Sequence, residues 1–322
     1  MTTRLTATST ASLRRCPRQY YWRFGLGLSR IRTATPLRFG RAFHKGIELR
    51  PGIGDENAEA DPQAALDTVL AGYAETPAWA DPTDWAVERE TLRALLLGYY
   101  WRYGKETLTH LAVEQAFQVP LVNPDTGSPS RAFTVAGRID GIVRLPDGRM
   151  AVLEVKTCSE DISPDSEYWL RLRGDGQISL YVLAARALGY DAATVLYDVT
   201  RKPTIRLRKA ETPEQYGDRL LADIGARPDY YYQRREVPRL DGDLLEYQAE
   251  LWQQAQHVLA TRRRASALAD PSRAWFRNVG RMTCGYCEFA DLCLSGVGVD
   301  PASPPAGYEL LADPHPELAE ED

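Results

Sequence analysis

Three charged residues in the middle of the chain have the types and spacing that metal-dependent hydrolysis requires. Glu154 and Lys156 are two residues apart in an apolar stretch, and Asp140 lies in the apolar stretch before it. Because the side chains of a strand alternate between its two faces, Glu154 and Lys156 project to the same side. Two carboxylates beside an ammonium group make a site for a divalent cation and an attacking water. The alternative for a Glu-x-Lys pair by itself is a surface salt bridge on a sheet.

The segment that carries these residues, 131–157, predicts a β-hairpin. Apolar residues recur on both sides of residues 146–148, which read Pro-Asp-Gly. This is a turn sequence, because proline presets φ, aspartate bonds its own backbone and glycine accepts a positive φ. Pairing of the two strands would bring Asp140 beside Glu154 and Lys156.

Other segments predict the elements around this hairpin. The first helical segment would begin at Ser12 as its N-cap. The segments with helical patterns are 10–28, 35–49, 62–73, 85–105, 175–190, 212–224 and 244–268. Strands are expected at 111–122, 194–200 and 230–239, with a loop at 51–61 and a polar connection at 159–173.

The composition is that of an ordinary globular protein. The 322 residues are 44% hydrophobic and 26% charged, which suits one large domain or two smaller ones. No apolar run is long enough to span a membrane, and the N-terminus lacks an apolar signal core, so a cytoplasmic location without membrane contact is expected. The net charge is −5, and seven of the 44 acidic residues lie in the tail from Asp300 onward. Because phosphate binding needs only a local basic surface, this charge leaves DNA binding open.

The first helical segment suggests a contact with nucleic acid. Arg18, Tyr20, Tyr21 and Arg23 place aromatic and basic side chains next to one another. Aromatic rings stack on bases while arginines meet phosphates, which suits a single strand. The alternative is a buried amphipathic helix whose arginines are solvated.

Five cysteines, an odd number, make a disulfide framework unexpected in a cytosolic chain. Cys284, Cys287 and Cys293 offer three thiolates within ten residues. A zinc or iron–sulfur site usually needs four, and Cys16 or Cys158 could supply the last. Cys158 directly follows the Glu-x-Lys strand and is better interpreted as a packing residue. Spacing alone does not decide between zinc, an iron–sulfur cluster and unrelated buried cysteines.

Six short motifs follow one another in an order that resembles one family. They are Cys-Pro-Arg-x-Tyr-Tyr from Cys16, Gly-x-x-x-His ending at His44, Gly-x-Ile-Asp-Gly around Asp140, Glu-x-Lys at Glu154, Gln-x-x-x-Tyr from Gln177 to Tyr181, and Cys-x2-Cys-x5-Cys from Cys284. Together they resemble the PD-(D/E)XK nucleases of the RecB type that carry an iron–sulfur cluster. This group includes the nuclease module of AddB and the small nucleases of CRISPR adaptation. The resemblance covers most of residues 10–293, apart from a helical insertion near 51–108.

The resemblance implies an α/β protein with a restriction-endonuclease-like core, in which helices flank a central mixed sheet. It implies Mg²⁺ or Mn²⁺ bound by His44, Asp140 and Glu154. The catalytic residues that it implies are Asp140, Glu154, Lys156, Gln177 and Tyr181. Lys156 would lie beside the attacking water, and Gln177 and Tyr181 would orient the substrate strand or a bound water. It also implies a [4Fe–4S] cluster, with Zn²⁺ as the second choice, on Cys16, Cys284, Cys287 and Cys293.

Five parts are expected along the chain. They are an N-terminal helical part with the first cluster cysteine and the metal-site histidine (1–50), a helical insertion (51–110), the nuclease core (111–240), a long helix with the other cluster cysteines (241–297), and an acidic, proline-rich flexible tail (298–322).

The expected function is hydrolysis of DNA phosphodiester bonds by a metal-dependent exonuclease that acts on single-stranded ends. Recombination, repair and end processing are the expected settings, with a helicase or recombination protein as a candidate partner. The main alternative is a non-catalytic iron–sulfur module that binds DNA or a partner within a helicase–nuclease or CRISPR-adaptation complex. Intact Asp140, Glu154 and Lys156 argue against that alternative. A different hydrolase that uses the same metal site is the third hypothesis.

Overall fold

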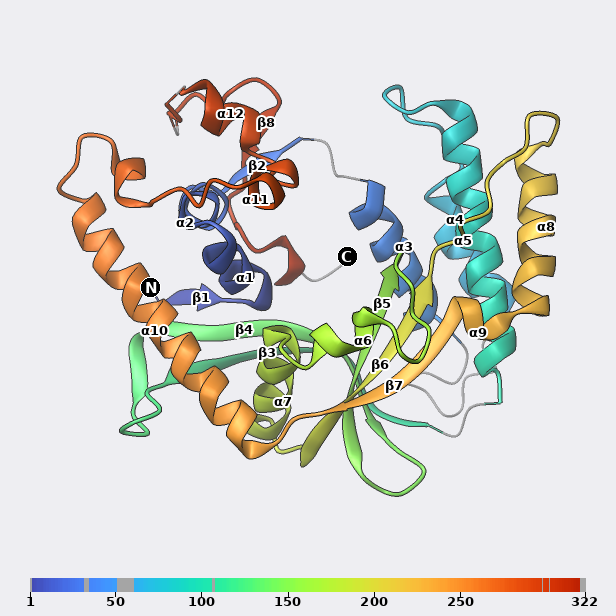
Figure 1. Ribbon diagram of the computed structural model, residues 1–322, viewed down its shortest axis with the longest axis horizontal. Coiled ribbons are helices and arrows are strands. Elements are labelled where there is room, and N and C mark those ends of the chain that lie inside the picture. Colours follow the sequence, from blue (N-terminus) through green and yellow to red (C-terminus); the bar gives the residue numbers. More distant parts are fainter. Residues whose placement is uncertain are drawn as a thin grey trace.

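A mixed sheet of six strands lies at the centre of the computed structural model (Figure 1). The structure describes residues 2–31, 35–50, 61–105, 108–296, 298–300 and 302–318. The strands are β1 (Thr3–Leu5), β2 (Leu28–Arg30), β3 (Thr109–Val122), β4 (Pro129–Arg144), β5 (Met150–Cys158), β6 (Ala192–Arg201), β7 (Tyr232–Pro238) and β8 (Tyr308–Leu310). The α-helices are α1 (Ala7–Arg15), α2 (Pro17–Tyr20), α3 (Thr35–Glu48), α4 (Pro62–Ala71), α5 (Pro82–Tyr103), α6 (Glu167–Leu172), α7 (Gly176–Ala187), α8 (Pro213–Ala226), α9 (Pro228–Tyr231), α10 (Asp241–Ala265), α11 (Arg281–Gly285) and α12 (Ala290–Ser295). Three tighter or wider turns are η1 (Tyr21–Gly25), η2 (Pro271–Ala274) and η3 (Pro316–Leu318).

Strand β4 is the longest strand and organises the sheet. Antiparallel β3 follows one edge of β4 along most of its length. The other edge is shared by parallel β1, at Phe133–Val135, and antiparallel β5, at Gly141–Arg144. Residues 136–140 therefore have no strand partner on that edge among the described pairings. Parallel β6 and antiparallel β7 extend the sheet beyond β5.

Two layers of helices bury the two faces of the sheet. Val152 of β5 belongs to the core cluster that includes residues of α7 and α10, whereas Leu153 and Val155 belong to the cluster that includes residues of α3, α5 and α8. This alternation is the one that a strand requires, and it assigns Glu154 and Lys156 to the α7 face. In Figure 1, α3, α4, α5 and α8 stand together, and α1, α2, α11 and α12 form a second group.

The predicted fold class is confirmed, as is the hairpin that carries the candidate residues. The helix predicted at 212–224 is confirmed with its capping box, in which the side chains of Thr212 and Gln215 each bond the backbone of the other residue. No helix in the described part of the chain is long and apolar enough to cross a membrane.

Helix α5 lies in the segment 51–110, which the sequence assigns to a helical insertion. Its Leu96 is fully buried in the same cluster as Leu153 and Val155 of the sheet. The helix therefore forms part of the layer that covers one face of the sheet. Most of the loop predicted at 51–61 lies outside the described residues.

The single helix predicted from 10 to 28 is wrong. Helix α1 begins earlier, with Thr6 rather than Ser12 as its N-cap, and it ends at Cys16. Cys16 is extended, with φ −162°, because the proline that follows it disfavours the helical conformation. A short α2 and a wide turn, η1, continue the chain. The break has a consequence for chemistry, since it turns the Cys16 side chain out of the helical repeat.

The polar connection predicted at 159–173 is also wrong. It contains α6, whose Tyr168, Trp169 and Leu172 are buried. One and a half turns of helix are too short to show a hydrophobic period in the sequence. The packed helix anchors the chain between β5 and α7, which carry four of the five candidate catalytic side chains.

The flexible tail predicted for residues 298–322 is wrong for residues 308–315. Strand β8 pairs with β2 near the other end of the chain, in the register Leu28↔Leu310. His315 is buried, and its ring stacks on Phe24 at 5.1 Å. The pairing explains why the sequence predicts a flexible tail here. The partner strand β2 lies near the N-terminus, so no local pattern indicates it. Residues 319–322 lie outside the described part.

Candidate functional site

The candidate site lies where β4 and β5 separate. Their ladder ends at the pair Gly141↔Leu153, so Asp140 and Glu154 are the first residues beyond it on each strand. The backbone N–H of Val155 donates to Oδ2 of Asp140 at 2.8 Å. The carboxylate of Asp140 thus replaces the backbone partner that the separated strand has lost. It is held in place by the sheet itself, at the unpaired edge of β4.

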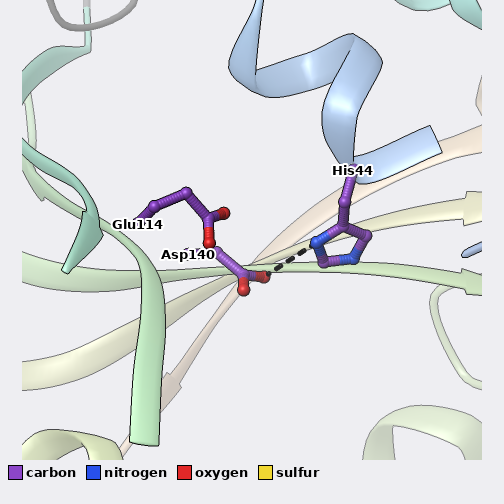
Figure 2. Close-up of side chains that lie close together, drawn as sticks. All are labelled: His44, Glu114 and Asp140. Atoms are coloured by element: carbon purple, nitrogen blue, oxygen red, sulfur yellow. Dashed lines mark ion pairs between the residues drawn. The ribbon is translucent and has the colours of Figure 1, made fainter. Parts of the chain in front are cut away.

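Three ligand groups converge at this point from three different elements. His44 comes from α3, Glu114 from β3 and Asp140 from β4, and each offers an atom within 4.8 Å of the others (Figure 2). His44 Nδ1 lies 3.7 Å from Asp140 Oδ2. One imidazole nitrogen and two carboxylates suit a divalent cation of the Mg²⁺ and Mn²⁺ type, and the imidazole favours Mn²⁺.

Glu114 was not a candidate on sequence grounds. The pairs Val113↔Gly141 and Gln115↔Ile139 put it opposite Asp140 in the β3–β4 register. Its φ is +47°, the one positive value for a non-glycine residue in the described chain. A glutamate in the left-handed region is uncommon, and such backbone conformations cluster at functional sites. Neither the register nor the φ angle leaves a signal in the sequence.

The other predicted residues form a second group on the α7 face. Lys156 Nζ lies 2.5 Å from Glu154 Oε1, which also accepts a hydrogen bond from Gln177 Nε2 at 2.9 Å. The side-chain oxygen of Gln177 accepts from Lys156 at 3.2 Å, and its amide donates to the Tyr181 hydroxyl at 3.1 Å. The spacing of four residues on α7 puts Gln177 and Tyr181 on one face, as predicted. These bonds fix the orientation of both the carboxylate and the ammonium group.

Glu154 has an unusual environment for a carboxylate. Its side chain is 2% exposed, and its Oε2 atom is buried without a hydrogen-bond partner in the described structure. Burial raises the pKa of Glu154, against the opposing effect of Lys156, and burial likewise raises the pKa of Asp140. A buried, unsatisfied carboxylate oxygen is costly unless a cation or a donor meets it. The residues present therefore fit a bound divalent ion.

The structure brings together all six predicted metal and catalytic residues, but in two adjoining groups. The group that meets metal-ligand spacing contains His44, Glu114 and Asp140. Glu154 lies next to this group, because Asp140 and His44 both influence its pKa, but it is bonded to Lys156 and Gln177. Glu154 as a ligand therefore stays a prediction.

The four cysteines of the predicted cluster line one cavity of about 30 Å³. Cys16 reaches it from the break between α1 and α2, Cys284 from α11 and Cys293 from α12, and Cys287 lies between these last two helices. Among the described residues, no three cysteine sulfurs lie within 4.8 Å of one another. Cys158 does not line the cavity; it packs against the main core, as predicted. The iron–sulfur cluster itself stays a prediction.

The predicted stacking of Tyr20 on nucleic acid is wrong. Tyr20 is 1% exposed, and its ring lies 5.6 Å from that of Trp275. Tyr21 stacks on the same indole with the ring centres 5.4 Å apart, and Arg18 donates to the Trp275 carbonyl at 3.0 Å. Arg23 is half-buried near Glu288. The buried alternative is therefore correct for Tyr20, and a contact of Arg18, Tyr21 or Arg23 with nucleic acid stays a prediction.

A mixed sheet that carries carboxylates and a Glu-x-Lys lysine where two strands separate defines a restriction-endonuclease-like core. Residues 4–294 match the model of the PD-(D/E)XK nuclease superfamily, and the chain belongs to that superfamily. This confirms the expected family in its broad form, a superfamily of nucleases that use divalent metals. Its assignment to the RecB and AddB group stays a prediction.

Two solved structures are distantly similar. The crystal structure of SSO0001 is 13% identical, with a TM-score of 0.36 over 92% of this chain and 87% of the other. The crystal structure of a phage-related exonuclease from Haemophilus somnus 129PT is 15% identical, with a TM-score of 0.27 over 64% of this chain and 89% of the other. Both likenesses are too distant to place individual residues. No curated protein matches the sequence.

Proposed function

We propose that the protein is a divalent-metal-dependent deoxyribonuclease that cleaves single-stranded DNA at free ends. The observation that carries the proposal is the convergence of His44, Glu114 and Asp140 beside the Glu154–Lys156 pair, in a chain of the PD-(D/E)XK superfamily. Mg²⁺ and Mn²⁺ are the ions that this donor set suits, with Mn²⁺ favoured by the imidazole.

The chain's own groups have distinct tasks in this account. His44, Glu114 and Asp140 hold the ion. Glu154, in the adjoining group, has a buried Oε2 atom without a hydrogen-bond partner, which supports a contact between that atom and the ion. The ion supplies positive charge against the phosphate and lowers the pKa of a water. Lys156 sits beside Glu154, where its ammonium group can orient the water and offset charge that develops on the phosphate.

Gln177 and Tyr181 act through Glu154 and Lys156 in this account. Gln177 bonds both members of the pair, so it fixes the separation between the carboxylate and the ammonium group. Tyr181 in turn accepts from Gln177, and its ring packs against Phe117. Their loss would misplace the lysine rather than remove it, which would lower the rate less than loss of Lys156 itself.

The proposal includes a [4Fe–4S] cluster on Cys16, Cys284, Cys287 and Cys293. Support comes from the one cavity that all four cysteines line. In this account the four thiolates hold the cluster, and Zn²⁺ is the second choice of occupant.

The test is cleavage of 5′- and 3′-labelled single-stranded DNA by anaerobically purified protein in Mn²⁺, Mg²⁺ or EDTA. We expect cleavage with either metal and none in EDTA, and the order in which the two labels are released gives the polarity. A Lys156→Ala variant with unchanged iron content and melting temperature should not cleave. Binding of DNA without cleavage by the iron-loaded protein would contradict the proposal and favour the non-catalytic module. Addition of a candidate helicase or recombination protein then tests for dependence on a partner.

A further inference from the structure

A groove of about 650 Å³ lies beside the helices on the sheet face that α3, α5 and α8 cover. Its walls come from the start of α3, the connection between α4 and α5, the first turns of α5, and the segment 202–207 that follows β6. In Figure 1 this last segment runs from β6 past α5 toward α8. The groove has a basic wall and an aromatic wall, and neither belongs to the metal site.

The aromatic wall presents an indole that is fixed in place. The guanidinium of Arg38 lies 5.2 Å from the ring centre of Trp79 and 4.7 Å from that of Trp85. Arg38 also donates two hydrogen bonds to Glu88, at 3.0 and 2.6 Å, so its charge is balanced. Trp79 nevertheless remains 48% exposed. A large aromatic ring held by its neighbours but open to solvent on one side is a stacking platform.

The basic wall is the segment 202–209, which reads Lys-Pro-Thr-Ile-Arg-Leu-Arg-Lys and contains no acidic residue. Lys202 is half-buried with its ammonium 4.4 Å from the ring centre of Phe39. In the described part of the chain this ammonium makes no hydrogen bond or ion pair. Burial lowers the pKa of Lys202, because it disfavours the charged ammonium group. A bound anion would offset that cost of burying the charge. Arg206, which is exposed, adds a second cation to the groove.

Three acidic residues also line the groove, and two of them are already engaged. Glu88 pairs with Arg38, and Asp81 accepts hydrogen bonds from the first backbone N–H groups of α5 as its N-cap. Asp84 lies one turn further along that helix. The acidic side chains thus all lie on or next to α5, whereas Lys202 and Arg206 lie together on the segment that follows β6, and an anionic ligand complements that basic wall.

The groove lies close to the metal site along two elements. Arg38 is six residues before His44 on α3, about 9 Å along the helix axis. The backbone N–H of Lys202 bonds the carbonyl of Cys158, two residues beyond Lys156 on β5 and about 7 Å along the strand. A strand whose phosphate lay at the metal site would therefore reach the groove within about two nucleotides.

We propose that this groove binds the DNA strand next to the bond that is cut, with a base stacked on Trp79 and phosphates at Lys202 and Arg206. Aromatic stacking beside cations is how proteins hold single strands without reading sequence. A volume of about 650 Å³ is that of a pocket for one small ligand, so it takes one or two nucleotides of a single strand. The inference rests on the proposed function, because it takes DNA as the substrate.

The experiment measures binding without cleavage. Fluorescence anisotropy follows a fluorescein-labelled oligothymidine on full-length, anaerobically purified Lys156→Ala protein in EDTA. Adding Trp79→Ala should weaken binding by about 5- to 100-fold. Adding Lys202→Met, which keeps the side chain over Phe39, should weaken it and lower the slope of log K against log salt by roughly 0.7.

Matched controls separate a local effect from a general one. Trp101 is 64% exposed on α5 and Lys105 is exposed beyond the end of that helix, and neither lines the groove. Trp101→Ala and Lys105→Met should leave the affinity within about twofold of the parent. All variants are compared by melting temperature, so that unfolding is recognised.

The inference is overturned if the Lys156→Ala parent does not bind the oligonucleotide, or if Trp79→Ala and Lys202→Met bind it as the parent does. Variants that bind a DNA duplex more weakly but bind the single strand as the parent does would also overturn it. Weakened binding in a protein whose wild type never cleaves DNA would uphold the groove and reject the nuclease. Cleavage with an unchanged KM in both groove variants would uphold the nuclease and reject the groove.

Discussion

The two candidate centres of this protein are built in opposite ways. The metal site is fixed by backbone pairing, because Asp140, Glu114 and Lys156 each lie on a strand of the same sheet. The cysteine cavity joins a helix break near the N-terminus to the two short helices α11 and α12. The first centre rests on the two largest core clusters, whereas the second rests on a small one around Trp22 and Phe289.

This difference separates catalysis from stability. A site that a sheet positions keeps its geometry when one side chain is changed, so variants there should lose function and keep the fold. The cysteine cavity lies between short helices that are far apart in the sequence. What the cysteines bind should stabilise this region strongly, because the free energy of metal binding adds to the free energy of folding.

The largest expected effect is loss of cleavage in Lys156→Ala. The ammonium group that contacts Glu154 and Gln177 would be gone, and the rate should fall by about 10³-fold or more. The melting temperature and iron content should match the wild type, as measured by thermal unfolding and iron analysis. A variant that loses iron together with activity would break the contrast, because the two centres would then be coupled.

Glu114→Gln should weaken Mn²⁺ binding by at least about 10-fold, because it removes one charged ligand from the group with His44 and Asp140. Titration calorimetry or Mn²⁺ electron paramagnetic resonance measures the affinity directly. Glu48→Gln is the matched control, since Glu48 lines the same small pocket but pairs with Lys45. Equal weakening in both variants would show that charge in the pocket, rather than ligation, sets the affinity.

Cys284→Ser should act on stability instead of chemistry. We expect the iron to be lost and the melting temperature to fall by about 5–10 °C, with faster proteolysis around α11 and α12. Mn²⁺ affinity at low temperature should be retained. Cys158→Ser is the control, because Cys158 lies outside the cavity and should keep its iron. Iron retained in Cys284→Ser would reject that residue as a ligand.

The smallest expected effect is a pH dependence of metal stabilisation. Burial raises the pKa of Asp140 and Glu154 above their ordinary values, so the folded metal-free protein holds these protons to higher pH than the unfolded chain does. The unfolding free energy should therefore fall as pH rises through that window. A bound ion removes this cost, so Mn²⁺ should raise the melting temperature more at about pH 8 than at about pH 5.5. Glu154→Gln should reduce the difference, and an equal shift at both pH values would contradict this explanation.

The same contrast explains what the sequence could predict. Asp140, Glu154 and Lys156 lie on one hairpin, where alternation and a Pro-Asp-Gly turn are local signals. Gln177 and Tyr181 share one helix face by simple spacing. His44 was a candidate only because its motif matched a family pattern, since a single histidine carries little information by itself.

The errors share a physical cause, which is dependence on distant partners. Glu114 faces Asp140 only through the β3–β4 register, which no local pattern specifies. Tyr20 is covered by Trp275, which follows it by more than 250 residues. The local sequence, in which aromatic and basic residues alternate, does not show this cover and therefore predicts an exposed stacking surface. The pairing of β8 with β2 is equally non-local, and proline-rich composition concealed it.

The most direct measurement is the Mn²⁺ dependence of single-stranded DNA cleavage by the iron-loaded wild type and by Asp140→Asn. Asp140 contacts both parts of the site. Its carboxylate accepts a hydrogen bond from the Val155 backbone N–H, where β4 and β5 separate, and it lies beside His44 of the ligand group. The account predicts saturable cleavage with Mn²⁺ in the wild type and at least about a 10³-fold loss in a variant that melts normally and keeps its iron. Equal cleavage by the two proteins would contradict the metal site, and with it the proposed function.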